Sequence, residues 1–224
     1  MEWNLSPEEV RVLGALIEKE ATTPDQYPLS INTLTQACNQ KSNRTPVMTL
    51  SEPDVRLTVN GLLRRGLVRH ASGYSGRVSR FEHRLGSTSV LAVRLDPPEL
   101  AVLALLFLRG AQTPGELRAR SQRMTDLADI PAVEDALHHL ETHPDGPLVW
   151  ALPREPGKRE QRYDHRLGQT AGADEHAGDA AGPSEAVLPA DQADSAGALE
   201  SRISALEQEV ASLRRAVAEL QRGS

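Results

Sequence analysis

Three donor side chains recur at helical spacing in the segment that follows Ser51. Arg56, Asn60 and Arg64 stand at i, i+4 and i+8, so a helix places them on one face. Arginine and asparagine make the bidentate hydrogen bonds that distinguish guanine and adenine edges in the major groove. The pattern favours a nucleic-acid contact, with a solvated helix face as the alternative.

Basic residues around this segment are suited to phosphate contacts. In the first half of the chain we predict such contacts for Lys41, Arg44, Arg77 and Arg80. The second half carries an auxiliary basic patch made of Arg118, Arg120, Arg123, Lys158, Arg159 and Arg162. Its third helix exposes acidic residues that repel phosphate, namely Glu134, Asp135 and Glu141. We therefore expect the second half to bind a partner or to pack, or at most to add an auxiliary phosphate contact.

The polar run at residues 39–44, with the sequence NQKSNR, connects two predicted helices. Its amide and hydroxyl groups can cap helix ends by bonding to backbone groups. The same groups can form a recognition surface, and the sequence leaves both uses open.

The histidines do not form a pattern that is typical of catalysis. His83 and His165 occupy equivalent positions in two copies of one motif, which favours a half-buried packing role. His139 and His143 are one helical turn apart, but no third metal ligand accompanies them. Nucleophile-elbow, Walker and dinucleotide motifs are missing as well. We expect no catalytic residue, no metal and no cofactor, and hence a protein that is not an enzyme.

An internal repeat organises the elements that position these residues. Residues 5–24 match residues 95–114 at nine of twenty positions, and RFEHRLG at 80–86 matches RYDHRLG at 162–168. Two copies with so long a period indicate duplicated domains rather than a solenoid.

Each copy predicts three helices followed by a β-hairpin. Capping boxes start the first helices at Ser6 and Asp96, Ser51 caps the third helix of the first copy, and the third helix of the second runs from about Ile130 to Glu141. Glycine-containing turns at 73–76 and 156–157 join the strands. This is the winged-helix order. We predict a mainly α fold with small β-hairpins (α+β), with tandem winged helix-turn-helix domains at 1–90 and 91–168.

The remainder predicts a linker and a coiled coil. Residues 169–197 contain no lysine, arginine or aromatic side chain, a composition typical of disorder. In 198–222 a heptad seam predicts a parallel homodimer, formed by Leu199, Ile203, Leu206, Val210, Leu213, Val217 and Leu220. The alternative is a single amphipathic helix that folds back on the body.

Charge and cysteine content indicate the cellular compartment in which the protein works. The chain has 224 residues with a net charge of −6, and the acidic excess lies in the last 56 residues, so residues 41–90 remain strongly basic. The single cysteine excludes an internal disulfide. No secretory leader and no apolar run of membrane-spanning length is present, so we expect a cytoplasmic protein without membrane contact.

Several uninterrupted motifs resemble those of the YceH-like family of bacterial proteins. They are RVLGALIEKE at 11–20, TPDQYPLS at 23–30, ACNQKSNR at 37–44, LRGAQTPGELR at 108–118 and the segment 152–162. Ala111 departs from the family pattern, which has proline there. The resemblance covers about residues 5–168 and implies tandem winged helices with a coiled-coil tail. It implies no activity, because the family is functionally uncharacterised.

Two functions of different class follow from these features. The first is a dimeric DNA-binding regulatory protein that acts through the first winged helix. The second is a scaffold or adaptor whose paired winged helices bind another protein without nucleic acid. Winged helices serve both uses, so the predicted fold does not choose between them.

Overall fold

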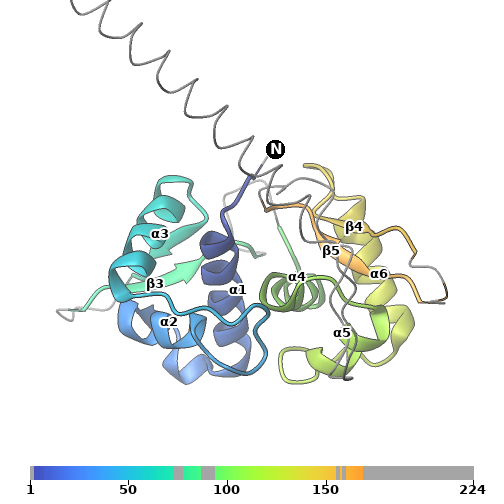
Figure 1. Ribbon diagram of the computed structural model, residues 1–224, viewed down its shortest axis with the longest axis horizontal. Coiled ribbons are helices and arrows are strands. Elements are labelled where there is room, and N and C mark those ends of the chain that lie inside the picture. Colours follow the sequence, from blue (N-terminus) through green and yellow to red (C-terminus); the bar gives the residue numbers. More distant parts are fainter. Residues whose placement is uncertain (1–2, 73–77, 87–93, 155–156, 158–159, 169–224) are drawn as a thin grey trace, which may run out of the picture. The chain divides into compact units, whose positions relative to one another are not determined.

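The computed structural model describes residues 3–72, 78–86, 94–154, 157 and 160–168. Within them the chain is α+β, with six α-helices and short antiparallel strands (Figure 1). The helices are α1 (Pro7–Thr22), α2 (Ile31–Cys38), α3 (Glu52–Arg64), α4 (Pro97–Arg109), α5 (Pro114–Ser121) and α6 (Ile130–Glu141). The strands are β1 (Leu29–Ser30), β2 (Val68–His70), β3 (Arg80–His83), β4 (Val149–Ala151) and β5 (Tyr163–His165), and a 3₁₀ turn, η1, spans Pro24–Gln26.

The helix starts follow from local capping chemistry. The Ser6 hydroxyl accepts from the Glu9 amide, and the Glu9 carboxylate accepts in return from the Ser6 amide, at 3.2 and 3.0 Å. The same reciprocal box begins α3 at Ser51, α4 at Asp96 and α5 at Thr113. The predicted starts of α1, α3 and α4 are confirmed.

Each half ends in a hairpin, as the glycine turns predicted. In the first half β2 pairs with β3, with Arg69 opposite Glu82, and in the second β4 pairs with β5, with Trp150 opposite Asp164. The first sheet also contains β1, which pairs with the other edge of β3 and gives the order β1-β3-β2. Sequence patterning missed β1 because two residues are too few for an alternating pattern.

The core lies around α1 and α4, which pack against each other (Figure 1). Each of them has eight consecutive buried residues, at 10–17 and 101–108. Gly14 permits the close approach, because a Cβ atom there would lie 2.9 Å from the Phe107 Cβ and 3.0 Å from Leu108 side-chain atoms. Residues of both halves therefore belong to one hydrophobic core.

All described residues belong to one compact unit, Met1–Ala173. The predicted linker at 169–197 and the predicted coiled coil at 198–222, with its seven seam residues, lie outside the described residues. The same holds for Arg77, Lys158 and Arg159. In the part that is described, no helix has both the length and the apolar character needed to span a membrane.

Candidate nucleic-acid interface

Helix α3 presents its predicted donors to solvent. Arg56, Asn60 and Arg64 are exposed, while the opposite face is buried through Val55, Val59 and Leu62. Among the described residues, no carboxylate lies within ion-pair distance of the two arginines. The sequence pattern thus identified a helix face whose cations are free to meet an external acceptor.

Arg65, the next arginine along the chain, is paired with a carboxylate, unlike Arg56 and Arg64. Arg65 donates to the Glu9 carboxylate at 2.8 Å and so ties the end of α3 to the start of α1. Arg69 is paired in the same way with Glu82 across the β2–β3 ladder, at 2.6 Å. Of the four arginines at 56–69, two are paired with carboxylates, and the two on the exposed face of α3 have no carboxylate partner in the part of the chain that the structure describes.

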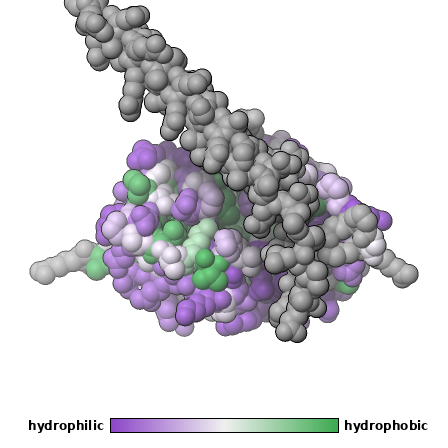
Figure 2. Space-filling model, in the orientation of Figure 1, coloured by the Kyte–Doolittle hydropathy of each residue, from purple (hydrophilic) through white to green (hydrophobic). Residues whose placement is uncertain are grey.

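Large apolar side chains also lie on this surface. Leu57, in α3, is 70% exposed, and Val47, in the segment before α3, is 52% exposed. Figure 2 shows hydrophobic side chains interrupting an otherwise polar face over α3 and the segment that leads into it. In a DNA groove an apolar side chain can contact the thymine methyl group, and in a protein interface it provides buried apolar area.

Arg44 was predicted to hold phosphate from the surface, but the structure places it inside the fold. Its side chain is fully buried and forms an ion pair with Glu18 at 2.6 Å. Its guanidinium also donates to the Ala37 carbonyl, at 3.1 Å from Nε and 2.9 Å from a terminal nitrogen. The Arg44 guanidinium therefore links the last turn of α2 to α1, which is a structural role.

Within the polar segment 39–44, Arg44 bonds to a carbonyl at the end of α2, whereas Asn39 bonds to the loop that leads into α3. The Asn39 amide exchanges two hydrogen bonds with the Leu50 backbone, at 2.7 and 2.8 Å, and so closes the loop between α2 and α3. Buried Arg11 donates to the Cys38 and Pro46 carbonyls from within α1. Burial, followed by the nearby charge of Arg44, lowers the pKa of Arg11.

Lys41 is the predicted phosphate contact of this segment that remains exposed. In the hairpin, Arg80 is half-buried and donates to the Pro28 carbonyl at 2.7 Å, which fixes the strand rather than leaving the guanidinium extended.

His83 and His165, the histidines at equivalent positions of the repeat, pack against other side chains, in agreement with the prediction. Each of them contacts a different kind of group. The His83 side chain is 3% exposed, its Nε2 lies 2.6 Å from Glu20, and its backbone amide donates to the Tyr27 hydroxyl. The hydrogen bond with His83 lowers the pKa of Glu20. His165 instead packs edge-on against Phe107, with ring centroids 5.0 Å apart. The pairing with Glu20 was not visible in sequence because 63 residues separate the two groups.

The auxiliary patch of the second half is used in part for internal contacts. Arg118 donates twice to the Ala128 carbonyl and so closes the turn between α5 and α6. Arg120 and Arg162 bond to groups near the α4–α5 connector, and Arg123 is exposed. The acidic residues predicted on the third helix, Glu134, Asp135 and Glu141, are all exposed on α6. This helix is therefore a poor counterpart of α3 for phosphate.

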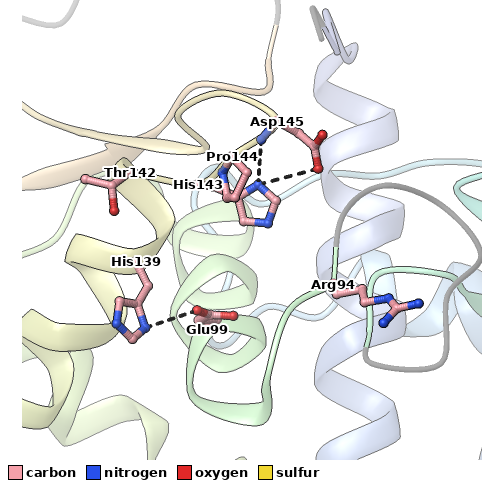
Figure 3. A pocket seen from close by; sticks show the side chains of 7 residues that line it. All are labelled: Arg94, Glu99, His139, Thr142, His143, Pro144 and Asp145. Carbon is pink, nitrogen blue, oxygen red and sulfur yellow. Dashed lines mark hydrogen bonds and ion pairs between the residues drawn. The ribbon is translucent and has the colours of Figure 1, made fainter.

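A shallow pocket of about 430 Å³ lies between α4 and the end of α6 and contains two histidine–carboxylate pairs (Figure 3). His139 Nδ1 lies 3.4 Å from Glu99, and His143 Nδ1 lies 3.8 Å from Asp145. Figure 3 shows each histidine turned to its own carboxylate rather than to a common point. Within the described ranges, no group of three histidine, cysteine or acidic side chains is arranged to hold a metal ion.

Comparison with known proteins identifies relatives over most of the described region. The UPF0502 protein of Vibrio campbellii is 53% identical over 165 residues, which are 74% of this chain and 76% of the relative. UPF0502 proteins of Klebsiella pneumoniae and Vibrio cholerae are 50% and 52% identical with the same coverage. A family model described as "Protein of unknown function, DUF480" matches residues 5–158. The resemblance drawn from the motifs agrees with these matches, and the chain belongs to the DUF480 (UPF0502) family of uncharacterised bacterial proteins.

Proposed function

We propose that the protein is a non-enzymatic tandem winged-helix protein that binds double-stranded DNA through α3 of its first half. The observation that carries the proposal is the pair of exposed arginines on α3 that have no carboxylate partner among the described residues, with Asn60 between them. Arginine and asparagine at this spacing match the donor and acceptor groups of guanine and adenine in the major groove.

The arrangement of elements supports the winged-helix assignment. In the first half three helices precede a hairpin, and a short strand between α1 and α2 completes the three-stranded sheet β1-β3-β2. The third helix of such a unit is the one that enters the major groove in helix-turn-helix proteins. Its outer face carries the donors, and Lys41 extends the basic surface into the preceding loop.

The two halves have different roles in this proposal. The α6 face exposes three carboxylates where α3 exposes arginines, and like charges repel phosphate. We therefore assign base contacts to the first half only. The predicted coiled coil would pair two chains, and paired recognition helices read two half-sites.

A fluorescence-anisotropy titration with duplex DNA tests the proposal. Replacing Arg56 and Arg64 together by alanine leaves the buried face of α3 intact, so the fold is retained. Removing one good base contact costs about 1–3 kcal/mol, or about 5- to 150-fold in affinity. If either arginine instead binds phosphate, the slope of log K against log salt falls by about 1 for each phosphate that the variant no longer neutralises.

The matched control replaces Arg94 and Arg166, two exposed arginines of the second half, and so removes the same net charge. We expect the control to bind nearly as well as the parent protein. Equal losses of affinity in both double variants would show unspecific attraction instead of recognition by α3. If the parent protein does not bind at about 50 mM salt, where electrostatic interactions are strong, the DNA proposal is refuted.

The exposed Leu57 supports the second candidate, a scaffold that binds another protein. At 70% exposure it is the most exposed large apolar side chain among the described residues, and apolar side chains of this kind occur in the centres of interfaces. Replacing Leu57 by serine would abolish capture of a stoichiometric protein partner from a nuclease-treated lysate. Binding by the scaffold would be unaffected by salt at levels that release DNA.

A further inference from the structure

The exposed faces of α3 and α6 carry opposite charges at equivalent positions of the repeat. Arg56 of α3 and Glu134 of α6 each directly follow a buried valine that the two halves share, and both are exposed. Toward the ends of the same helices, Arg64 and Glu141 are exposed as well, and α6 adds exposed Asp135. The duplication therefore gives one chain two similar helix faces of opposite sign.

Neither face is neutralised by the rest of the described chain. Among the described residues, no carboxylate lies within ion-pair distance of Arg56 or Arg64, and no basic side chain lies within that distance of the three α6 acids. Burial, followed by the charges of Glu141 and Glu134, raises the pKa of Tyr163 on β5. The negative charge of α6 thus extends to the neighbouring hairpin.

The charges are spaced alike along the two helices. Arg56 and Arg64 are eight residues apart, and Glu134 and Glu141 are seven residues apart. At the rise of an α-helix these separations are about 12 Å and about 10.5 Å. Long arginine side chains absorb so small a difference, so two helices of this kind lying side by side place two arginines opposite two carboxylates.

Exposed apolar side chains accompany the charges on both surfaces. Leu57 lies in α3 and Val47 in the segment before it, while Ile130 is the first residue of α6. Trp150 lies on β4, which packs against α6. Exposed ion pairs alone contribute little free energy, whereas apolar and aromatic side chains at the centre of an interface contribute most of it. Both surfaces have the two kinds of group that an interface needs.

The two faces of one chain do not meet. Helix α3 packs on α1, α6 packs on α4, and α1 packs against α4. Helices α3 and α6 therefore lie on opposite sides of the α1–α4 pair (Figure 1). The face that complements α3 has to come from another copy of the chain.

We propose that α6 of one copy docks on the exposed face of α3 of a second copy, with the α6 carboxylates against Arg56 and Arg64, and so covers the face that α3 offers to DNA. Carboxylates and phosphates are both acceptors for the guanidinium fork, which makes α6 a competitor of the duplex. The competition rests on the proposed function, whereas the contact between copies rests only on the two faces.

Chemical cross-linking of the full chain tests the contact. One preparation carries Asn60→Cys on the exposed face of α3, and the other carries His138→Cys on the exposed face of α6. The two are mixed and treated with a short bismaleimide. Native Cys38 is buried, and burial raises the pKa of its thiol to about 12, so it does not react. We expect mass spectrometry to identify a cross-link between residues 60 and 138 of different chains.

A charge swap separates the contact from misfolding and from chance proximity. Arg56→Glu with Arg64→Glu in the first preparation should abolish the cross-link, and so should Glu134→Arg with Glu141→Arg in the second. Mixing the two swapped preparations should restore it, because each arginine again faces a carboxylate. Neither a misfolded variant nor a coiled coil that joins the chains produces such a rescue. A cross-link that is missing from the unswapped mixture, or that is indifferent to the swaps, refutes the contact.

Fluorescence anisotropy with duplex DNA tests the competition. Glu134→Gln with Glu141→Gln uncovers α3 and should tighten DNA binding, by about tenfold if only one α3 face in ten is free in the parent protein. The control, Asp126→Asn with Glu160→Gln, removes the same charge from exposed positions outside α6 and should follow the parent. Equal gains in both double variants would show a general loss of repulsion and would refute the competition.

The outcomes distinguish this contact from the α3 proposal. If the parent protein binds DNA but the cross-link does not follow the charges, the contact is refuted and the α3 proposal stands. If the cross-link follows the charges but DNA does not bind, the contact stands, the DNA proposal is refuted and α3 is a surface for self-association. If neither is observed, both are wrong.

Discussion

Replacing Gly14 by alanine tests whether the two halves are held together by the close packing of α1 and α4. In the middle of an exposed helix this change stabilises by about 1 kcal/mol, because glycine has the greater backbone freedom to lose. At Gly14 the new Cβ would lie 2.9 Å from the Phe107 Cβ. That atom is fixed by the α4 backbone, so the helices have to move apart.

The magnitude follows from the two opposing contributions. Overpacking a well-packed core costs about 1–3 kcal/mol, and the helix-propensity gain of about 1 kcal/mol offsets part of it. We expect Gly14→Ala to lower the free energy of unfolding by up to about 2 kcal/mol. For a chain of this size, the melting temperature falls by about 2–4 °C for each kcal/mol.

Gly61→Ala is the matched control, since Gly61 lies within α3 and its added Cβ would lie 3.3 Å from the Glu9 Oε1 atom. The Glu9 carboxylate is bonded to Ser6 and Arg65 through Oε2, and its Oε1 atom has to shift by only a few tenths of an ångström. The propensity gain should therefore prevail, and this variant should be as stable as the parent or more so. Urea denaturation followed by far-ultraviolet circular dichroism measures both variants. If Gly14→Ala is as stable as Gly61→Ala, α1 and α4 do not pack as tightly as this reasoning requires, and it fails.

Two further predictions concern buried charge. Arg44→Ala should lower the free energy of unfolding by about 3–5 kcal/mol, because it leaves the Glu18 carboxylate without its buried partner. Arg65→Ala removes a more exposed ion pair and should cost less than about 1 kcal/mol in the same denaturation assay. Burial lowers the pKa of His165, which packs beside Phe107 and whose enclosed Nδ1 has no hydrogen-bond partner among the described residues. The unfolded chain therefore binds the proton more readily, so stability should be full above the unfolded pKa of 6.5 and fall as the pH drops below it, by at most about 1.4 kcal/mol per pH unit. Denaturation of the parent and of His165→Gln between neutral and mildly acidic pH measures this, and an equal pH dependence in both would contradict it.

Local patterns in the sequence were sufficient for the helices and for the exposed donors. Ser6 and Ser51 with an acid three residues on specify helix starts, because the capping bonds are made within four residues. The spacing of Arg56, Asn60 and Arg64 specifies a common face, because helical periodicity is local. The repeat predicted three helices followed by a hairpin in both halves, and the described residues agree, although the first half also contains η1 and β1.

Tertiary structure decided which cations remain available. Arg44 and Arg56 look equivalent in sequence, yet the first is buried against Glu18 and the second is exposed. Nothing in the sequence singled out Arg109. In the structure its guanidinium donates to the Asn43 side chain, which is 66 residues away. A charged side chain is neutralised by whatever lies within a few ångströms, and long-range packing determines what lies there. The sequence by itself therefore determined where the helices form and which side chains share a helix face. Only the packing of α1, α4 and the segment before α3 determined which arginines are exposed and which are paired inside the fold.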